Sequence, residues 1–123
     1  MRLKLLALLL IAALLLPSAK AQVPGDIGPC TLDMAKMVEI MSDYSLEHQN
    51  KIGGGQFWGL TDFYHKIIYV DSTPDFVMRR TIVLHEMLHV CYRMKGIDTS
   101  AGLGEIAVQM QAQALYLKLF GSE

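Results

Sequence analysis

The sequence predicts an α+β fold, built as one small domain behind a short N-terminal leader. Three observations carry this prediction. Apolar residues recur at helical spacing over residues 31–48, two runs rich in aromatic and β-branched residues follow at 57–60 and 65–70, and two more helical stretches occupy residues 75–94 and 102–120. A helix, a pair of strands and two further helices, in that order, are typical of an α+β domain.

The first predicted helix, residues 31–48, carries an apolar stripe at spacings of three and four, and Thr31 is its expected N-cap. The stripe consists of Leu32, Met34, Met37, Val38, Met41 and Tyr44. Three consecutive glycines at 53–55 follow, and they predict a flexible connection. They do not suggest a phosphate-binding loop, because no lysine and serine pair comes after them.

The two runs after the glycines, FWGL at 57–60 and HKIIYV at 65–70, are expected to form a short antiparallel pair of strands. Trp58 is expected in the core. Residues 71–75, DSTPD, then combine a turn, a cap and a proline, which is how a helix commonly begins. The helix over 75–94 should stop before the glycine at 96, and the last helix should end at the glycine at 121.

Residues 1–21 have the three-part composition of a secretory signal peptide. Arg2 and Lys4 give the positive start, residues 5–16 form the apolar segment, and Ala19-Lys20-Ala21 is a small-x-small cleavage site. The apolar segment is well short of the roughly 20 residues that a bilayer-spanning helix needs. We therefore expect cleavage after Ala21, no membrane attachment afterwards, and a secreted or periplasmic domain over residues 22–123. An uncleaved anchor is the alternative.

The charge balance after the leader is mildly acidic. Three of the 11 Lys and Arg residues lie in the leader, so 8 basic residues face 12 acidic ones and the net charge is −4. This balance gives no electrostatic basis for nucleic-acid binding. The two cysteines, Cys30 and Cys91, predict a disulfide in an exported chain, with two buried free thiols as the alternative. Nothing in the sequence defines an oligomeric state.

The stretch TIVLHEMLHV, residues 81–90, favours a metal site. His85 and His89 lie four apart, on the same face of a helix, so both imidazoles can reach one ion. Glu86 lies about 100° round the helix from His85, where it would reach a water on that ion. The helix is apolar nearly all round, so both histidines should be buried and need partners. The alternative is two core histidines that hydrogen-bond to the backbone.

A catalytic zinc ion usually takes three protein ligands and leaves one position for water. Glu105 is the favoured third ligand, because it lies 16 residues after His89, beyond a turn, where a reversing chain would bring it back to the metal. Gln109 shares a helix face with Glu105 and could accept the ring N–H of a ligand histidine. The alternative third ligands are His48, His65 and Asp98. Of these, His48 is expected to be solvated.

Residues 58–90, WGLTDFYHKIIYVDSTPDFVMRRTIVLHEMLHV, resemble the core of compact zincin-type metallopeptidase-like proteins of bacteria and phages, akin to the ImmA/IrrE-like group. In these proteins a strand that ends in an acidic turn leads into the helix with the H-E-x-x-H pattern. The following helix is matched loosely by Glu105 and Tyr116. The resemblance implies a minimal zincin-like fold of the glutamate-ligand type, in which His85, His89 and Glu105 bind Zn²⁺.

That resemblance and the residue pattern together predict a zinc-dependent peptide-bond hydrolase. Glu86 would act as the catalytic base and return its proton to the leaving amine. Candidates for the donor to the oxyanion are Tyr116, Tyr92 and His65. The expected partner is a peptide or protein substrate, extended along the edge strand of the pair. The alternatives are a catalytically inactive, zinc-stabilised binding or inhibitor module on the same scaffold, and a metal-free helical domain.

Overall fold

The computed structural model describes residues 30–121, and within them the α+β prediction is confirmed: three α-helices accompany a three-stranded mixed sheet. The elements in chain order are α2 (Met34–Asp43), β1 (Ser45–Gln49), the 3-10 helix η2 (Ile52–Gly55), β2 (Gly59–Asp62), β3 (Ile67–Asp71), α3 (Phe76–Met94) and α4 (Gly102–Phe120). The predicted signal peptide and its cleavage site after Ala21 lie outside the described residues.

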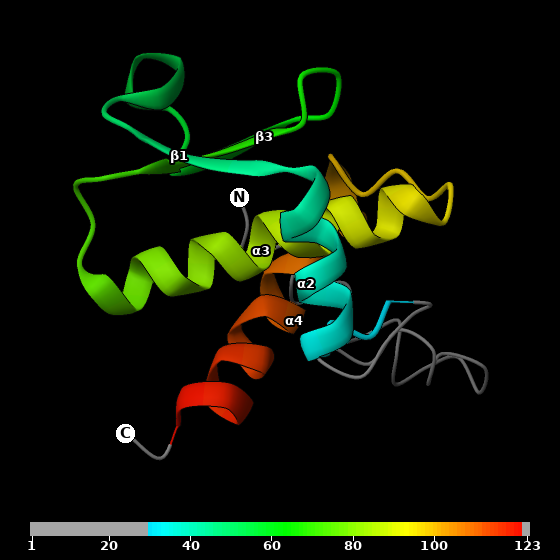
Figure 1. Cartoon of the computed structure of the whole chain (residues 1–123). Helices are drawn as coiled ribbons and strands as arrows, with labels where there is room; N and C mark the ends of the chain where they lie inside the picture. The colour runs from blue at the N-terminus through cyan, green and yellow to red at the C-terminus, as the bar shows by residue number, and fades with distance from the viewer. Residues whose placement is uncertain (1–29, 122–123) are drawn as a thin grey trace.

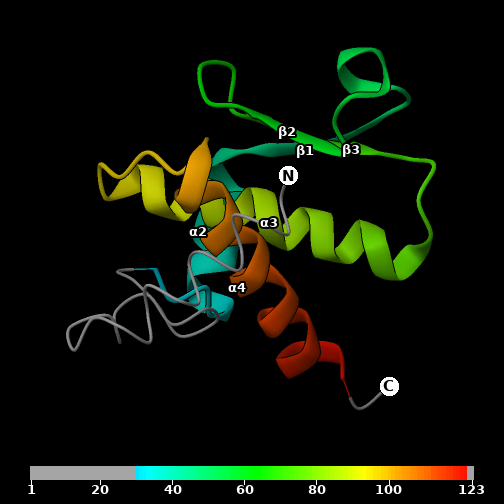
Figure 2. The ribbon, with the colours of Figure 1, turned by 180° about the vertical axis from the view of Figure 1, so that it is seen from behind.

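Helix α3 lies at the centre of the molecule, with the sheet along one side and α4 crossing it on the other (Figure 1). Helix α2 packs beside the C-terminal half of α3, as both opposite views show (Figure 2). Because α3 contacts every other layer, nearly all of its second half is buried, from Ile82 and Leu84 through to Tyr92. The predicted burial of both histidines is therefore confirmed.

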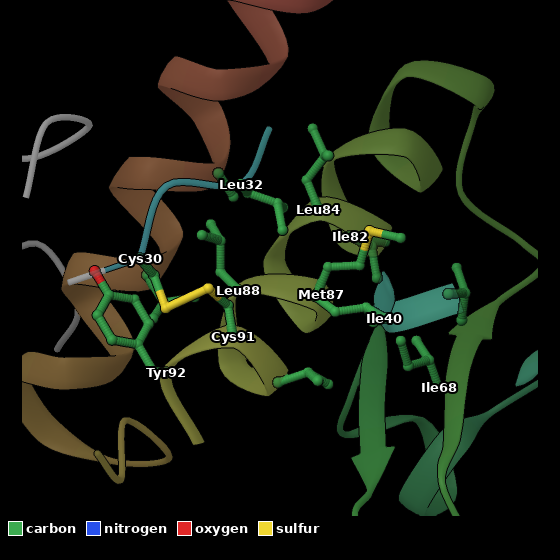
Figure 3. Close-up of a cluster of buried hydrophobic side chains, with 14 residues drawn as sticks. Cys30, Leu32, Ile40, Ile68, Ile82, Leu84, Met87, Leu88, Cys91 and Tyr92 are labelled. Carbon is green, nitrogen blue, oxygen red and sulfur yellow. A yellow bond between two sulfur atoms is a disulfide. The ribbon is translucent and has the colours of Figure 1, made fainter. Parts of the chain in front are cut away.

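The core fills the space on both sides of α3 (Figure 3). Strand β3 contributes Ile68 and Val70, which alternate along the strand and so face α3 together. Helix α4 contributes Val108 and Ala112 from the opposite side. Each of these four side chains is completely shielded from water. The core thus fixes how the sheet and α4 sit against the helix that carries the histidines.

The first helix is shorter than the prediction of 31–48. Its N-cap is Asp33, whose carboxylate accepts the backbone N–H of Lys36 at 2.8 Å, so the expected cap at Thr31 is wrong. The chain leaves the helix after Asp43, and Ser45–Gln49 form strand β1, parallel to β3. The sequence SLEHQ contains no β-branched residue, and all five residues are exposed. Pairing with β3 therefore makes this segment a strand, against its local preference.

The predicted antiparallel pair is confirmed, although β2 begins two residues later than expected. Leu60 opposes Tyr69 in the register, and the sheet order is β1-β3-β2, so β2 is an edge strand. The tight turn between β2 and β3 is held by Asp62, which accepts the backbone N–H groups of Tyr64 and His65. Trp58, just before β2, is 50% exposed, so its expected place in the core is wrong.

Both long helices follow the prediction closely. Asp75 caps α3 by accepting the backbone N–H of Met78 at 2.9 Å, and α3 ends at Met94. Helix α4 spans Gly102–Phe120, the predicted range. Among the described residues, none of the helices combines the length and the apolar character that crossing a bilayer requires.

A disulfide joins Cys30 to Cys91, as predicted, and links the segment before α2 to the second half of α3 (Figure 3). The carbonyl of Cys30 also accepts a hydrogen bond from the side-chain amide of Gln111 at 2.9 Å. Gln111 in turn accepts the hydroxyl of Tyr92 at 2.8 Å. The start of the described chain is therefore tied to α3 and α4. A disulfide fits an oxidising compartment outside the cytosol.

Candidate metal centre

The fold brings together the three residues predicted as metal ligands. His85 and His89 project from the buried half of α3, and Glu105 comes from the first turns of α4. His85 Nε2 lies 2.8 Å from one carboxylate oxygen of Glu105, and His89 Nε2 lies 3.0 Å from the other. The two Nε2 atoms are 3.0 Å apart. Within the described residues, this triad is a group that could hold a metal ion.

Hydrogen bonds on the far side of each ring determine which nitrogen faces the centre. His85 Nδ1 lies 2.6 Å from the side-chain oxygen of Gln109, which can only accept, so His85 donates from Nδ1. This is the role predicted for Gln109. His89 Nδ1 lies 2.8 Å from the hydroxyl oxygen of Thr99, which can accept the ring N–H. Both Nε2 atoms therefore face one another and the carboxylate of Glu105, so that, once deprotonated, their lone pairs could bind one cation between them.

The donor atoms have the chemistry and the spacing of a small tetrahedral cation site. Two imidazoles and one carboxylate make up a ligand set found in catalytic zinc sites. Ligand atoms about 2.0 to 2.1 Å from a tetrahedral ion stand about 3.3 Å from one another. The three measured separations, 2.8, 3.0 and 3.0 Å, fall slightly inside that value. The residues present therefore fit a divalent metal ion.

The electrostatics of the triad keep its carboxylate ionised. Burial raises the pKa of Glu105, but hydrogen bonds from His85 and His89 outweigh burial and lower that pKa to about 2. Burial lowers the pKa of His85, and the adjacent carboxylates of Glu105 and Glu86 more than reverse this, so the pKa of His85 is raised. A negative charge therefore stands ready beside two ring nitrogens to receive a cation.

Glu86 lies next to the triad without belonging to it. Its Oε2 is 3.9 Å from His85 Nε2, so it borders the same space as the donor atoms. Its Oε1 accepts the hydroxyl of Thr61 at 2.8 Å, which leaves Oε2 as the oxygen directed towards the centre. Burial raises the pKa of Glu86. A buried carboxylate with a raised pKa is suited to taking up a proton.

Strand β2 approaches Glu86 so closely that position 59 requires glycine. A Cβ atom on Gly59 would lie 2.6 Å from Ile82 Cγ2 and 2.9 Å from Glu86 Oε2, both too short for ordinary contact. Thr61, two residues further along the strand, faces the same side and reaches the same carboxylate. The edge strand and the histidine helix therefore hold Glu86 between them.

The triad and Glu86 line one cavity of about 630 Å³. Its walls come from residues 56–61 and Phe63, from the face of α3 that carries both histidines, from the loop at 97–100 and from the first turns of α4. Strand β2 thus forms one border of the cavity with its free edge nearby. A molecule that enters the cavity contacts both the edge strand β2 and the side chains of the triad.

The structure does not bring the three predicted oxyanion donors to this cavity. Tyr116 lies about 16 Å further along α4 than Glu105, where it packs against the core and the ring of Phe120. Tyr92 is buried and donates to Gln111. His65 lies exposed in the turn after β2 with its ring against Asp62. Within the described residues, none of the three lines the cavity.

The alternative ligands also lie apart from the triad. Asp98 borders the cavity, but its carboxylate accepts two hydrogen bonds from Ser100, which lower its pKa. His48 is exposed on β1, so its expected solvation is confirmed. Glu105 is therefore the residue that completes the set.

Two threonines and a glycine at the centre are absent from the sequence-based prediction. Thr61 and Thr99 hold Glu86 and His89, and Gly59 allows the close approach of β2. No local pattern marks them, because each acts on a residue from another element. The strand register offers one signal in retrospect: positions 59 and 61 alternate to the same face as the buried Ile68 and Val70 opposite them.

Comparisons of this chain with protein families, with curated proteins and with solved structures found no match. The geometry and the chemistry of the candidate metal centre are therefore the basis for inferring a function.

Proposed function

We propose that this protein is an exported, zinc-dependent peptide-bond hydrolase with a minimal zincin-like arrangement. One observation carries the proposal: a buried triad of His85, His89 and Glu105 shares a cavity with Glu86, whose Oε2 lies 3.9 Å from His85 Nε2. The layout also supports it, because the histidine helix lies beneath an edge strand and the third ligand comes from the next helix.

The chain's own residues supply the acid–base chemistry. When bound by the triad, zinc would polarise the substrate carbonyl and lower the pKa of a water towards about 7. Glu86 accepts the proton of the attacking water at Oε2 and hands it to the leaving amine. Thr61 keeps Oε1 occupied, so the proton is exchanged at the oxygen that faces the reacting groups. Gln109 holds the ring of His85 in the tautomer that leaves Nε2 free, and the hydroxyl of Thr99 can accept the Nδ1–H of His89 in the matching tautomer.

The substrate in this proposal is an extended peptide that pairs with the free edge of β2. The carbonyl of Trp58 accepts the N–H of Asp71 at 2.7 Å, so residues 58, 60 and 62 point their backbone groups at β3. Gly59 and Thr61 then point theirs outwards. A peptide bonded to these two residues runs past Glu86, because Glu86 contacts Thr61 and lies against Gly59.

Replacing the third ligand tests the centre directly. We expect Glu105→Ala to weaken zinc binding by more than about 100-fold, because losing a ligand should cost at least as much as losing the partner of one. Metal content by elemental analysis and zinc affinity by competition with a chelator are the measurements. Glu47→Ala, an exposed carboxylate on β1, is the matched control and should bind zinc normally. Unchanged affinity in Glu105→Ala would mean that Glu105 is not a ligand.

Thr61 is expected to act on kcat through Glu86. Thr61→Val keeps the shape of the side chain but cannot donate to Glu86 Oε1, and we expect kcat to fall about tenfold with little change in KM. Thr61→Ser retains the hydroxyl and should recover most of that loss. Steady-state kinetics on one peptide substrate gives both values. Equal kcat values in the valine and serine variants would show that the hydroxyl has no such role.

One observation favours the second candidate function, a catalytically inactive binding or inhibitor module stabilised by zinc. None of Tyr116, Tyr92 and His65, the expected oxyanion donors, is among the cavity-lining residues of the described chain. This alternative predicts a protein that binds zinc through the triad and cleaves nothing. Incubating the zinc-loaded protein with a mixed peptide library, followed by mass spectrometry, separates the two functions.

A further inference from the structure

The cavity has an apolar end, and the course of β2 along α3 shows where it lies. Gly59 lies against Ile82 and Glu86, and further along the strand direction Phe63 stacks with Arg93. Strand β2 therefore runs alongside α3 in the same direction. Residues just before Gly59 accordingly fall at the end of the cavity formed by the first turns of α3, away from Arg93. The apolar cavity-lining residues of this end are Phe57, Trp58, Met78 and Ile82, which we call the apolar wall, and the polar Gln56 and Thr81 lie beside them.

Three members of the apolar wall are unusually open to water. Phe57 is 46%, Trp58 50% and Met78 42% exposed, and all three line the cavity that contains the metal centre. Large apolar side chains gathered in a cavity lose their contact with water only when a ligand covers them. The opposite end of the cavity carries Arg93, Asp98 and Ser100 beside the apolar Phe63 and Ile97. The two ends therefore offer different chemistry on the two sides of the metal centre.

The glycine run before β2 holds this wall in place. Residues 52–55 form the η2 turn, in which Gly53 and Gly54 adopt φ values of +60° and +73°. A Cβ atom on Gly53 would lie 2.6 Å from the ring of Phe57, so the ring rests directly on the glycine backbone. The N–H of Phe57 also donates to the carbonyl of Ile52, whose side chain is buried. The ring of Phe57 is thus positioned before any ligand arrives, which lowers the cost of binding.

We propose that the apolar wall binds one large apolar side chain of the substrate peptide, such as Leu, Met or Phe, on one side of the cleaved bond. The inference rests on the proposed function, since it assumes a peptide along β2. Phe57 and Trp58 lie within one or two residues of Gly59 on the chain, and Gly59 lies against Ile82 and Glu86. The side chain that contacts the wall therefore belongs to a residue close to the cleaved bond. On the other side, towards Arg93, charged and polar groups of the cavity lining can also contact polar residues of the substrate.

Binding to an inactive protein tests this inference without relying on turnover. The probes are acetylated and amidated hexapeptides of alanine, each with a single Phe, Leu, Asp or Lys at one of the six positions. They are titrated into zinc-loaded Glu86→Gln protein by calorimetry. Trp58, the one tryptophan in the sequence, gives a fluorescence signal from the wall itself. We expect Phe or Leu at one position to bind at least about tenfold more tightly than Asp there, with a blue shift of the Trp58 emission.

Variants of the wall identify the residues responsible. In the Glu86→Gln background, Phe57→Ala and Trp58→Ala should each reduce the preference for Phe or Leu several-fold. Met78→Glu, an exposed position on α3, should shift the preference towards Lys without disturbing the core. Tyr64→Ala is the matched control, because Tyr64 is 88% exposed and lies in the turn after β2, outside the cavity lining. It should leave the preference unchanged.

The outcomes separate this inference from the proposed function. If the wild-type protein cleaves no peptide but Glu86→Gln binds the Phe and Leu peptides through the wall, the hydrolase proposal fails. The inference that the apolar wall binds a large apolar side chain of a peptide then stands. If the wild-type protein cleaves peptides with equal rates for apolar and acidic residues, and the wall variants change nothing, the inference is overturned. It is also overturned if phosphatidylcholine vesicles shift the Trp58 emission while none of the peptides does so.

Discussion

Glu86→Gln is expected to abolish peptide hydrolysis while the protein keeps its zinc. The amide has the shape of the carboxylate and can still accept the hydroxyl of Thr61, but it cannot take a proton from water. General-base catalysis contributes about 10² to 10⁴ in rate, and we expect kcat to fall by at least that factor. Glu86 Oε2 lies 3.9 Å from His85 Nε2 and is not one of the three donors, so the metal content should remain the same.

The measurement is hydrolysis of a library-selected peptide, together with the zinc content of the same preparation. Glu47→Gln on β1 is the control for the substitution itself, since Glu47 is fully outside the centre. Hydrolysis at the wild-type rate in Glu86→Gln would end the assignment of Glu86 as the base. Loss of zinc in that variant would instead show that Glu86 is a ligand.

Removing the disulfide is expected to lower the free energy of unfolding by about 4 kcal/mol, because the loop between Cys30 and Cys91 spans a sequence separation of 61. The total free energy of unfolding of a protein is only about 5 to 15 kcal/mol, so this loss would leave a small domain only marginally stable. Both sulfur atoms belong to buried residues, so the double substitution Cys30→Ala and Cys91→Ala avoids placing hydroxyls in the core. Urea denaturation followed by circular dichroism gives the free energy.

The zinc-free form is the one to compare, because bound metal would add its own stabilisation to both proteins. Wild-type protein treated with a reductant is the second comparison and should match the double alanine variant. A difference of less than about 1 kcal/mol between the oxidised wild type and the double variant would refute the expectation. The same samples show whether zinc restores the fold, since Cys91 lies two residues after His89, a candidate metal ligand.

The elements that the sequence predicts well are those whose signals are local. Helix α3 has its cap at Asp75, and its apolar residues continue to the turn at Gly96. Strand β1 could not be recognised, because SLEHQ has no β-branched residue and becomes a strand only through its parallel pairing with β3. Such a pairing joins residues that are far apart in sequence, and no window of neighbouring residues contains it.

The same distinction applies to the candidate metal centre. The spacing of His85 and His89 on one helix predicts that both face the same point. The expected reversal of the chain after α3 predicts that Glu105 joins them. The donors to the oxyanion could not be chosen in this way. Tyr116 shares a helix face with Glu105, but the axis of α4 carries it away from the cavity. Thr61 and Thr99 depend on how separate elements pack, which the residue pattern does not contain.

The length of the short connection between α3 and α4 matters more to the candidate metal centre than the length of the turn around Tyr64. This connection carries Thr99, the partner of His89, and a Cβ on Gly104 would lie 3.0 Å from the Cα of Thr99. Inserting even one residue there would shift Thr99 and Glu105 at the same time. Tyr64, at the turn between β2 and β3, is 88% exposed and lies outside the cavity lining. Natural or engineered insertions, tags and grafted loops should therefore be tolerated at Tyr64 and excluded between Gly96 and Gly102.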